Sequence, residues 1–331
     1  MDELLNIMRA LADPTRLRIV LLIRQLELSV GEVVQILGQS QPRVSRHIRI
    51  LDEAGIAERR KEGAWVFLRP GPVLTGALLD PLFANSNSNE ARVVQRDLAK
   101  LEQVRAERAD MAADYFAGHA GEWDSLRSLH VAESEVEASI LRILDTAPLG
   151  HVLDVGTGTG RMIELFAAQA RQFVALDNNT EMLRLARAKL ANMEPASAGK
   201  VDILLGDFNA LPLPDGGFDT ILFHQVLHYA QHPERVISEA ARVLAPSGRL
   251  MIVDFAAHDH EELRTVHAHA RLGFTDDMIE RAFAASDIHL AHQASLDGGP
   301  LAVKIWLGQK RGLAAGERAP TATSSQLRIV A

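Results

Sequence analysis

Three glycines follow a short apolar run in the segment Val152-Leu-Asp-Val-Gly-Thr-Gly-Thr-Gly160. The run has the length of a buried strand, and a helical pattern begins directly after it. Glycines at such a turn let the backbone approach a ligand closely and point its amide groups toward that ligand. Position 161 is arginine, so the spacing is G-x-G-x-G and not the G-x-G-x-x-G of dinucleotide sites. The segment therefore predicts a nucleotide-like ligand other than NAD.

Three carboxylates stand where predicted strands end. Asp154 lies inside the glycine-rich segment, Asp177 ends the run that begins at Phe173, and Asp207 follows the run that begins at Ile203. Ligands of doubly wound sheets bind at these strand ends, and one carboxylate can accept both hydroxyl groups of a ribose. Each acid alone could be a surface or helix-capping residue, but three in succession favour a shared ligand site.

The glycine loop and its acids resemble motif I of the class I S-adenosylmethionine-dependent methyltransferases, over about residues 115–310. Leu213–His224 resembles their fourth-strand segment, and Tyr115-Phe116 with Trp123-Asp124 resembles their aromatic cap. The resemblance implies S-adenosylmethionine (SAM) or S-adenosylhomocysteine (SAH) as the cofactor. It places the methionine ammonium on the first acid and the adenine on the third. The implied ligand residues are Asp154, Gly156, Gly158, Gly160, Asp177, Asn178, Met182, Asp207, Phe208 and His224.

Methyl transfer needs alignment of the acceptor with the sulfonium group and, for some acceptors, a general base. His224 and His228 are the candidate catalytic residues. The chain has no Asn-Pro-Pro-Tyr-like segment for adenine or glutamine methylation, and no cysteine for arsenic chemistry. The sequence therefore leaves the acceptor open.

The 13 histidines also raise a metal site as a competing hypothesis. Nitrogen ligands with Asp254 or Asp259 could bind zinc, but the spacings match no established zinc motif. We therefore predict no metal. The clustered histidines are His224, His228, His232, His258, His260, His267 and His269.

The first 70 residues carry a different pattern. Apolar residues at helical spacing predict helices over 3–12 and 14–26, then a short helix capped by Ser29 and a further helix capped by Ser40. Two strands over 56–60 and 64–69 predict a hairpin wing. The order is that of a winged helix-turn-helix, and it resembles the ArsR family of bacterial regulators. ArsR relatives act as symmetric dimers on palindromic sites, which implies a homodimer on double-stranded operator DNA.

The helix after Ser40 is the predicted DNA-reading element. Val44, Ile48 and Leu51 share its inner face, which leaves its polar residues free for DNA. Arginine suits both phosphates and guanine edges, so the base-reading residues stay open. The predicted DNA contacts are Gln41, Arg43, Ser45, Arg46, His47 and Arg49 on the helix, and Arg59, Arg60 and Lys61 on the wing.

Composition sets outer bounds on these predictions. At 331 residues the chain suggests two domains, and without cysteines it forms neither disulfides nor thiolate metal sites. No apolar run reaches membrane-spanning length and no signal-peptide pattern opens the chain, so we expect no membrane contact and a cytoplasmic protein. Residues 1–70 hold 11 Lys/Arg against 9 Asp/Glu, whereas the remainder is net negative. DNA contact is therefore expected near the N-terminus.

The predicted fold class is a winged helix joined to an α/β, Rossmann-like doubly wound sheet. Strands and helices alternate from 151 to 254, and 288–296 with 301–307 should form a C-terminal antiparallel hairpin. The predicted domains are a DNA-binding domain over 1–83, a connecting segment over 84–114, a SAM/SAH-binding domain over 115–311 and a flexible tail over 312–331. The apolar stripe of helix 90–112 could pack on its own chain or form a dimer.

Two functions fit this combination. The first is a dimeric transcription regulator whose methyltransferase-fold domain binds SAM or SAH as an effector. The alternative is a bifunctional protein whose C-terminal domain methylates a small molecule. The missing acceptor signatures favour the first.

Overall fold

The computed structural model describes residues 2–62, 65–74, 89–119, 133–297 and 301–312. The chain forms two compact units, Met1–Ala112 with Asp259–Glu261, and Ala113–His258 with Glu262–Ala331. Their boundary falls inside the predicted connecting segment 84–114. The predicted linker around residues 85–88, Trp123-Asp124 of the predicted aromatic cap and the tail from 313 lie outside the described residues, as do the side chains of Tyr115 and Phe116.

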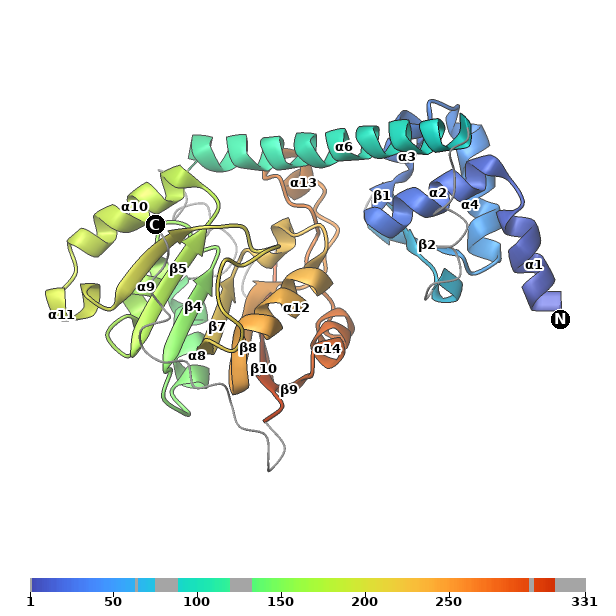
Figure 1. The fold of residues 1–331 in the computed structure, drawn as a ribbon. Helices are drawn as coiled ribbons and strands as arrows, with labels where there is room; N and C mark the ends of the chain where they lie inside the picture. Colours follow the sequence, from blue (N-terminus) through green and yellow to red (C-terminus); the bar gives the residue numbers. More distant parts are fainter. Residues whose placement is uncertain (1, 63–64, 75–88, 120–132, 298–300, 313–331) are drawn as a thin grey trace. The chain divides into compact units, whose positions relative to one another are not determined.

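The first unit is a winged helix (Figure 1). Its three strands are antiparallel and follow the order β1-β3-β2, in which the two-residue β1 was not predicted. Asp13 caps α2 by accepting from the amides of Thr15 and Arg16, and Ser29 forms a capping box with Glu32 at α3. The elements are α1 (Asp2–Leu11), α2 (Pro14–Gln25), β1 (Leu28–Ser29), α3 (Val30–Leu37), α4 (Gln41–Glu53), β2 (Ala57–Glu62), β3 (Trp65–Pro70) and η1 (Pro72–Leu74).

The long helix α6 (Asn89–His119) packs its first half on the winged helix. Leu101 and Val104 are buried in the same hydrophobic cluster as the core of α2 and α4. Arg18 on α2 donates to the buried carboxylate of Asp97 at 2.8 Å. The apolar residues Leu101 and Val104 of α6 therefore pack on their own domain. Of the two roles that the sequence left open for this helix, packing on its own chain and forming a dimer, this is the first.

The second unit is a Rossmann-like α/β fold, which confirms the predicted fold class. Its seven-stranded sheet has the order β6-β5-β4-β7-β8-β10-β9, with parallel pairing from β6 to β8 and antiparallel pairing of β10 with β8 and β9. The elements are α8 (Glu133–Leu144), β4 (His151–Val155), α9 (Arg161–Phe166), β5 (Gln172–Asp177), α10 (Thr180–Ala191), α11 (Pro195–Ala198), β6 (Val201–Leu205), β7 (Phe218–His224), η3 (Leu227–Tyr229), α12 (Pro233–Val243), β8 (Leu244–Phe255), α13 (Glu262–Val266), α14 (Asp276–Ala285), β9 (Ile288–Leu296) and β10 (Val303–Lys310).

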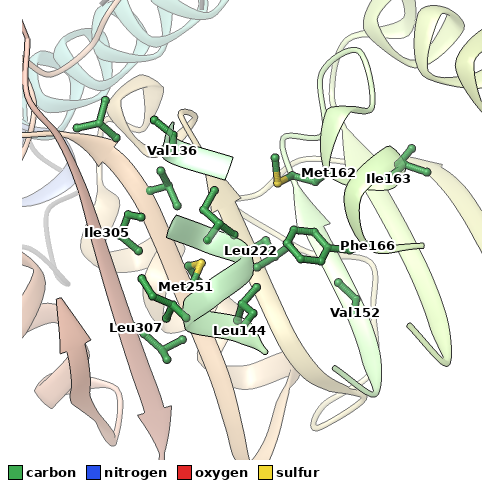
Figure 2. Close-up of a cluster of buried hydrophobic side chains, with 14 of the residues drawn as sticks. Val136, Leu144, Val152, Met162, Ile163, Phe166, Leu222, Met251, Ile305 and Leu307 are labelled. Carbon is green, nitrogen blue, oxygen red and sulfur yellow. The ribbon is translucent and has the colours of Figure 1, made fainter. Parts of the chain in front are cut away.

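Each face of this sheet buries its own apolar cluster. Val152 on β4 faces Phe166 and Leu144 from the helices of one side (Figure 2), whereas its neighbour Leu153 belongs to the cluster of the other side with α12 and α14. Burial on both faces is why the parallel strands read as continuous apolar runs. In the described residues, no helix is long and apolar enough to cross a membrane.

Candidate functional site

The glycine loop leaves β4 in a conformation that only glycine adopts readily. Gly156, Gly158 and Gly160 have φ angles of 72°, 54° and 86°. The amide of Gly156 donates to the carbonyl of Leu176 at 2.8 Å, which ties the loop to β5. A Cβ at position 156 would lie 2.3 Å from Cγ2 of Val226, so the Val226 side chain packs directly against the loop backbone. The loop is the tight turn that its spacing predicts.

Asp177 fixes the loop from the end of β5. Its Oδ2 accepts from the amide of Gly158 at 2.8 Å and its Oδ1 accepts from the amide of Asn179 at 2.9 Å. The residue is 8% exposed. Burial raises the pKa of Asp177, against the lowering effect of these backbone amides. Each oxygen keeps acceptor capacity for a further donor, as two ribose hydroxyls would require.

The other predicted ligand residues lie along the same carboxyl edge of the sheet, with different exposure. The amide of Gly206, directly after β6, donates to the Asp177 carbonyl, so Asp207 follows directly beside Asp177. Asp207 is exposed and Phe208 is half-buried. Asp154, Met182 and His224 are buried, whereas Asn178 is exposed.

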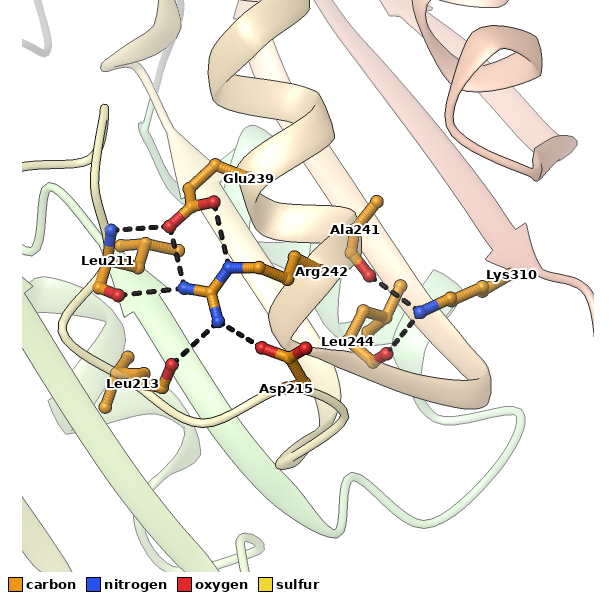
Figure 3. A network of polar contacts seen from close by, with 8 residues as sticks. All are labelled: Leu211, Leu213, Asp215, Glu239, Ala241, Arg242, Leu244 and Lys310. Atoms are coloured by element: carbon orange, nitrogen blue, oxygen red, sulfur yellow. Dashed lines mark hydrogen bonds and ion pairs between the residues drawn. The ribbon is translucent and has the colours of Figure 1, made fainter. Parts of the chain in front are cut away.

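An arginine that the sequence patterns did not single out fixes the segment after Asp207. Arg242 on α12 donates to the carbonyls of Leu211 and Leu213 at 2.9 and 3.0 Å, and Glu239 accepts from the Leu211 amide at 2.8 Å (Figure 3). These bonds hold the β6–β7 connection against α12. No local motif announces this role, because the partners are separated by about thirty residues in the chain.

Of the two candidate catalytic histidines, His224 ends β7 and His228 follows in η3. His228 is 2% exposed, and its Nδ1 lies 2.7 Å from Oδ1 of Asp254, near the end of β8. The sequence patterns indicated His228 as a catalytic candidate, but they indicated Asp254 only as a possible metal ligand. The position of Asp254 at a strand end was the signal that could have found this pair. Among the described residues, no three His, Asp or Glu side chains gather as metal ligands.

Helix α4 presents most of its predicted DNA contacts to solvent. Val44, Ile48 and Leu51 are buried as expected. A hollow of about 360 Å³ separates the start of α4 from the wing, and exposed Trp65 lines it with Arg59. Sequence reasoning had not named Trp65. The predicted contacts that are exposed on this face are Gln41, Arg43, Ser45, Arg46 and Arg49 on α4, with Arg59 and Lys61 on the wing.

Two predicted DNA contacts are turned toward the domain itself. Arg60 donates to Glu27 at 2.9 Å and lies over the ring of Phe67, because side chains alternate along β2 and Arg60 takes the inner face. His47 is 13% exposed at its side chain, and its Nδ1 lies 3.7 Å from Asp13. Arg59 and Lys61 remain the wing residues placed for a phosphate backbone.

Charges around His47 act on its titration. Burial lowers the pKa of the imidazole, and three guanidinium groups lower it further, against the raising effect of Asp13. These cations belong to Arg16, Arg43 and Arg46. The neutral ring is therefore the favoured form in the folded domain.

This lowered pKa predicts a pH-dependent stability. The unfolded chain binds a proton at His47 near the ordinary value of 6.5, whereas the folded domain resists it. The stability is therefore present above the unfolded pKa and is lost as the pH falls through the folded pKa. We expect His47→Gln to flatten the dependence of unfolding free energy on pH between about 7.5 and 5, measured by urea unfolding. Exposed His292 on β9 offers the control: His292→Gln should keep the wild-type slope.

Two known families match the chain, one in each unit. Residues 13–59 match the family described as bacterial regulatory protein, arsR family, and residues 153–252 match the family described as methyltransferase domain. The chain is 34% identical over 160 residues to phosphatidylethanolamine N-methyltransferase of Cereibacter sphaeroides, covering 46% of this chain and 76% of that protein. The chain belongs to the methyltransferases. Its other unit carries an ArsR-type DNA-binding domain. The chain therefore combines the DNA-binding domain of a regulator with a domain of the kind that binds SAM.

Two other proteins similar to this ArsR–methyltransferase fusion each match about half of the chain. A ubiquinone/menaquinone biosynthesis C-methyltransferase of Pseudoalteromonas translucida is 28% identical over 168 residues; the match covers 47% of this chain and 64% of that protein, less than two thirds of its length. Magnesium protoporphyrin IX methyltransferase of Synechocystis, solved with bound SAM, is 17% identical, with a TM-score of 0.44 over 54% of this chain and 79% of that structure.

Proposed function

We propose that the fusion is a dimeric, DNA-binding transcription regulator whose methyltransferase-fold domain binds SAM or SAH as an effector. The observation that carries this proposal is the glycine loop held by Asp177. The buried carboxylate of Asp177 accepts from backbone amides of the loop and of Asn179, at the carboxyl edge of the sheet. The exposed polar face of α4 supplies the DNA-binding half of the proposal.

The residues present suit an adenosyl ligand. Asp177 keeps acceptor capacity for ribose hydroxyls, and Asp207 with Phe208 offers an acceptor and a ring for adenine. Thr157, inside the loop, is buried and its hydroxyl makes no hydrogen bond within the described residues. A buried hydroxyl without a partner is costly, and a bound polar ligand would satisfy it. When bound, SAM would supply a sulfonium-activated methyl group.

An exposed apolar face on α1 supports the dimer. Leu4, Leu5 and Met8 lie on one side of this helix, with exposed fractions of 52%, 45% and 52%. Apolar side chains of α1 would be expected to cover the core of so small a domain, and here these three do not. A second copy of the same domain is the partner we propose for them, because a two-fold symmetric pair matches a palindromic operator.

The effector role predicts that an adenosyl ligand changes DNA affinity. A ligand shifts the regulator only by its differential affinity for the two states, so we expect SAM and SAH to change operator affinity unequally, by about 5- to 150-fold for the stronger of the two. The measurement is fluorescence anisotropy of operator DNA with the full chain at constant salt. Equal DNA affinity with SAM, with SAH and without ligand, at saturating ligand, would exclude an effector role.

A second function, methylation of a small molecule, is favoured by one observation. His228 is fixed by a buried carboxylate at the same sheet edge as the glycine loop. Transfer of a labelled methyl group from SAM to small acceptors, compared with the variant Asp154→Ala, tests it. Turnover no greater than that of the variant counts against catalysis and leaves the effector role standing.

A further inference from the structure

The pair of Asp254 and His228 has the geometry of a proton acceptor. Oδ1 of Asp254 lies 2.7 Å from Nδ1 of His228, and Oδ2 accepts from the His228 backbone amide at 3.1 Å. The amide of Phe255 also donates to Oδ1, at 2.8 Å. An ionised carboxylate only accepts, so the neutral ring carries its proton on Nδ1 and its lone pair on Nε2. The carboxylate thus fixes one tautomer, as the aspartate of a hydrolase triad does.

The other nitrogen of this ring has no structural use. Nε2 of His228 is buried and makes no hydrogen bond within the part of the chain that the structure describes. If the ring served packing alone, an aromatic side chain without a polar nitrogen could fill the same space. It would do so without the cost of an unsatisfied buried acceptor. The unused lone pair therefore points to a group that arrives with a ligand.

The pair lies beside the glycine loop. Strands β4, β7 and β8 are adjacent and parallel, so the segments that follow them meet at one edge of the sheet. Val226, two residues before His228, is the side chain that a Cβ at Gly156 would strike at 2.3 Å. The segment that carries His228 is therefore in direct contact with the loop that we propose holds the adenosyl ligand.

Neighbouring groups hold the ring in place. The imidazole lies 4.1 Å from the ring of Tyr229 and 4.1 Å from the ring of His269, measured between centroids. The backbone amide of Arg271 donates to the His228 carbonyl at 3.0 Å. Among the described residues, the ionisable side chains of Asp254, Tyr229 and His269 contact the His228 ring, and Asp254 is the one that bonds to it.

We infer that His228 is a general base, positioned by Asp254, for methyl transfer to acceptors that lose a proton when they are methylated: amines, hydroxyls or thiols. As the acceptor atom bonds to the methyl carbon, the carbon–sulfur bond breaks and its electron pair stays on sulfur. The acceptor's proton passes to Nε2, and the resulting imidazolium faces the Asp254 carboxylate. The inference rests on the proposed binding of SAM, and it excludes acceptors without such a proton, such as tertiary amines and thioethers.

Nuclear magnetic resonance of the full chain with ring-¹⁵N histidine tests the geometry without turnover. The neutral His228 ring, assigned by its loss in His228→Gln, should be the Nδ1–H tautomer. Its Nε2 resonance should differ between the SAM and the SAH complexes, because a sulfonium charge close to Nε2 acts on that nitrogen. His292 on the far edge strand β9 should give the same resonances with both ligands, and His269→Phe removes the signals of the facing histidine ring.

The outcomes separate the two proposals. Calorimetric binding of both ligands with an Nε2–H tautomer, or with the same His228 Nε2 resonance in both complexes, would overturn the general base while the adenosyl site stands. Absence of binding by either ligand would remove the proposed function, and the base with it. This measurement on the wild-type chain decides even if a substitution at Asp254 prevents folding.

Acceptor class is tested with labelled SAM and four probes: phenol, benzyl mercaptan, benzylamine and N,N-dimethylbenzylamine. We expect transfer to at least one of the first three, reduced about 100-fold in His228→Gln, with little or none to the tertiary amine. Asp254→Asn should lower the rate and change its pH profile, which a merely structural residue would not do. Preference for the tertiary amine, no transfer to any of the first three, or transfer unchanged by His228→Gln would overturn the assignment.

Discussion

Asp177→Ala is expected to lower the affinity for SAM and SAH by about 100-fold or more. The variant lacks the carboxylate and therefore the two bonds that we expect it to accept from the ribose. Hydrogen bonds to a charged group contribute about 1.5–3 kcal/mol each to binding. The variant also lacks the bond to the Gly158 amide, which fixes the middle of the glycine loop. Isothermal calorimetry with each ligand measures the loss.

The same change should cost little folding stability. Burial raises the pKa of Asp177 above 3.8, so the folded chain holds that proton more tightly than the unfolded chain. The carboxyl group thus contributes stability at pH values below the unfolded pKa, and this contribution is lost as the pH rises through the folded pKa. At neutral pH its removal relieves a buried charge, which offsets the two amide groups left without an acceptor. A thermal melt near that of the wild type is expected.

Asp202 offers a matched control on the neighbouring strand. It is an exposed acid on β6 whose Oδ2 accepts from Gln172 at 2.8 Å, away from the glycine loop. Asp202→Ala should bind both ligands as the wild type does. Wild-type affinity in Asp177→Ala would contradict the ribose role and, with it, the proposed orientation of the ligand.

The fold and the ligand loop were predictable because their signals are local. Apolar runs alternating with helical patterns announce a parallel sheet, and a glycine loop at a strand end announces the edge where ligands bind. The backbone angles of Gly156, Gly158 and Gly160 follow from residue type and spacing alone.

The orientation of single side chains was not predictable in the same way. His47 turns from the DNA face because the capping carboxylate of another helix lies beside it. Arg60 turns inward because strand alternation gives it the opposite face from Arg59. The partner of His228 lies on a different strand, 26 residues further along the chain. Each of these depends on contacts between elements distant in sequence, which no local pattern encodes.

The stripe of α6 bears on the second large prediction, which concerns the dimer. Leu101 and Val104 are buried in the winged-helix core, so these residues of α6 are not available to a partner subunit. The exposed apolar face of α1 takes their place. The double variant Leu4→Glu/Met8→Glu is therefore expected to be monomeric in sedimentation velocity.

Loss of the dimer should weaken binding to a palindromic operator by about 10²- to 10⁴-fold, because the second half-site contact is no longer intramolecular. Affinity for an isolated half-site should stay at the wild-type level, since the α4 face is unchanged. Val266→Glu, at an equally exposed valine of the other unit, is the control and should leave assembly and DNA affinity intact. A dimeric double variant would move the interface away from α1, whereas a monomer with undiminished operator affinity would mean that the regulator reads DNA as a single copy.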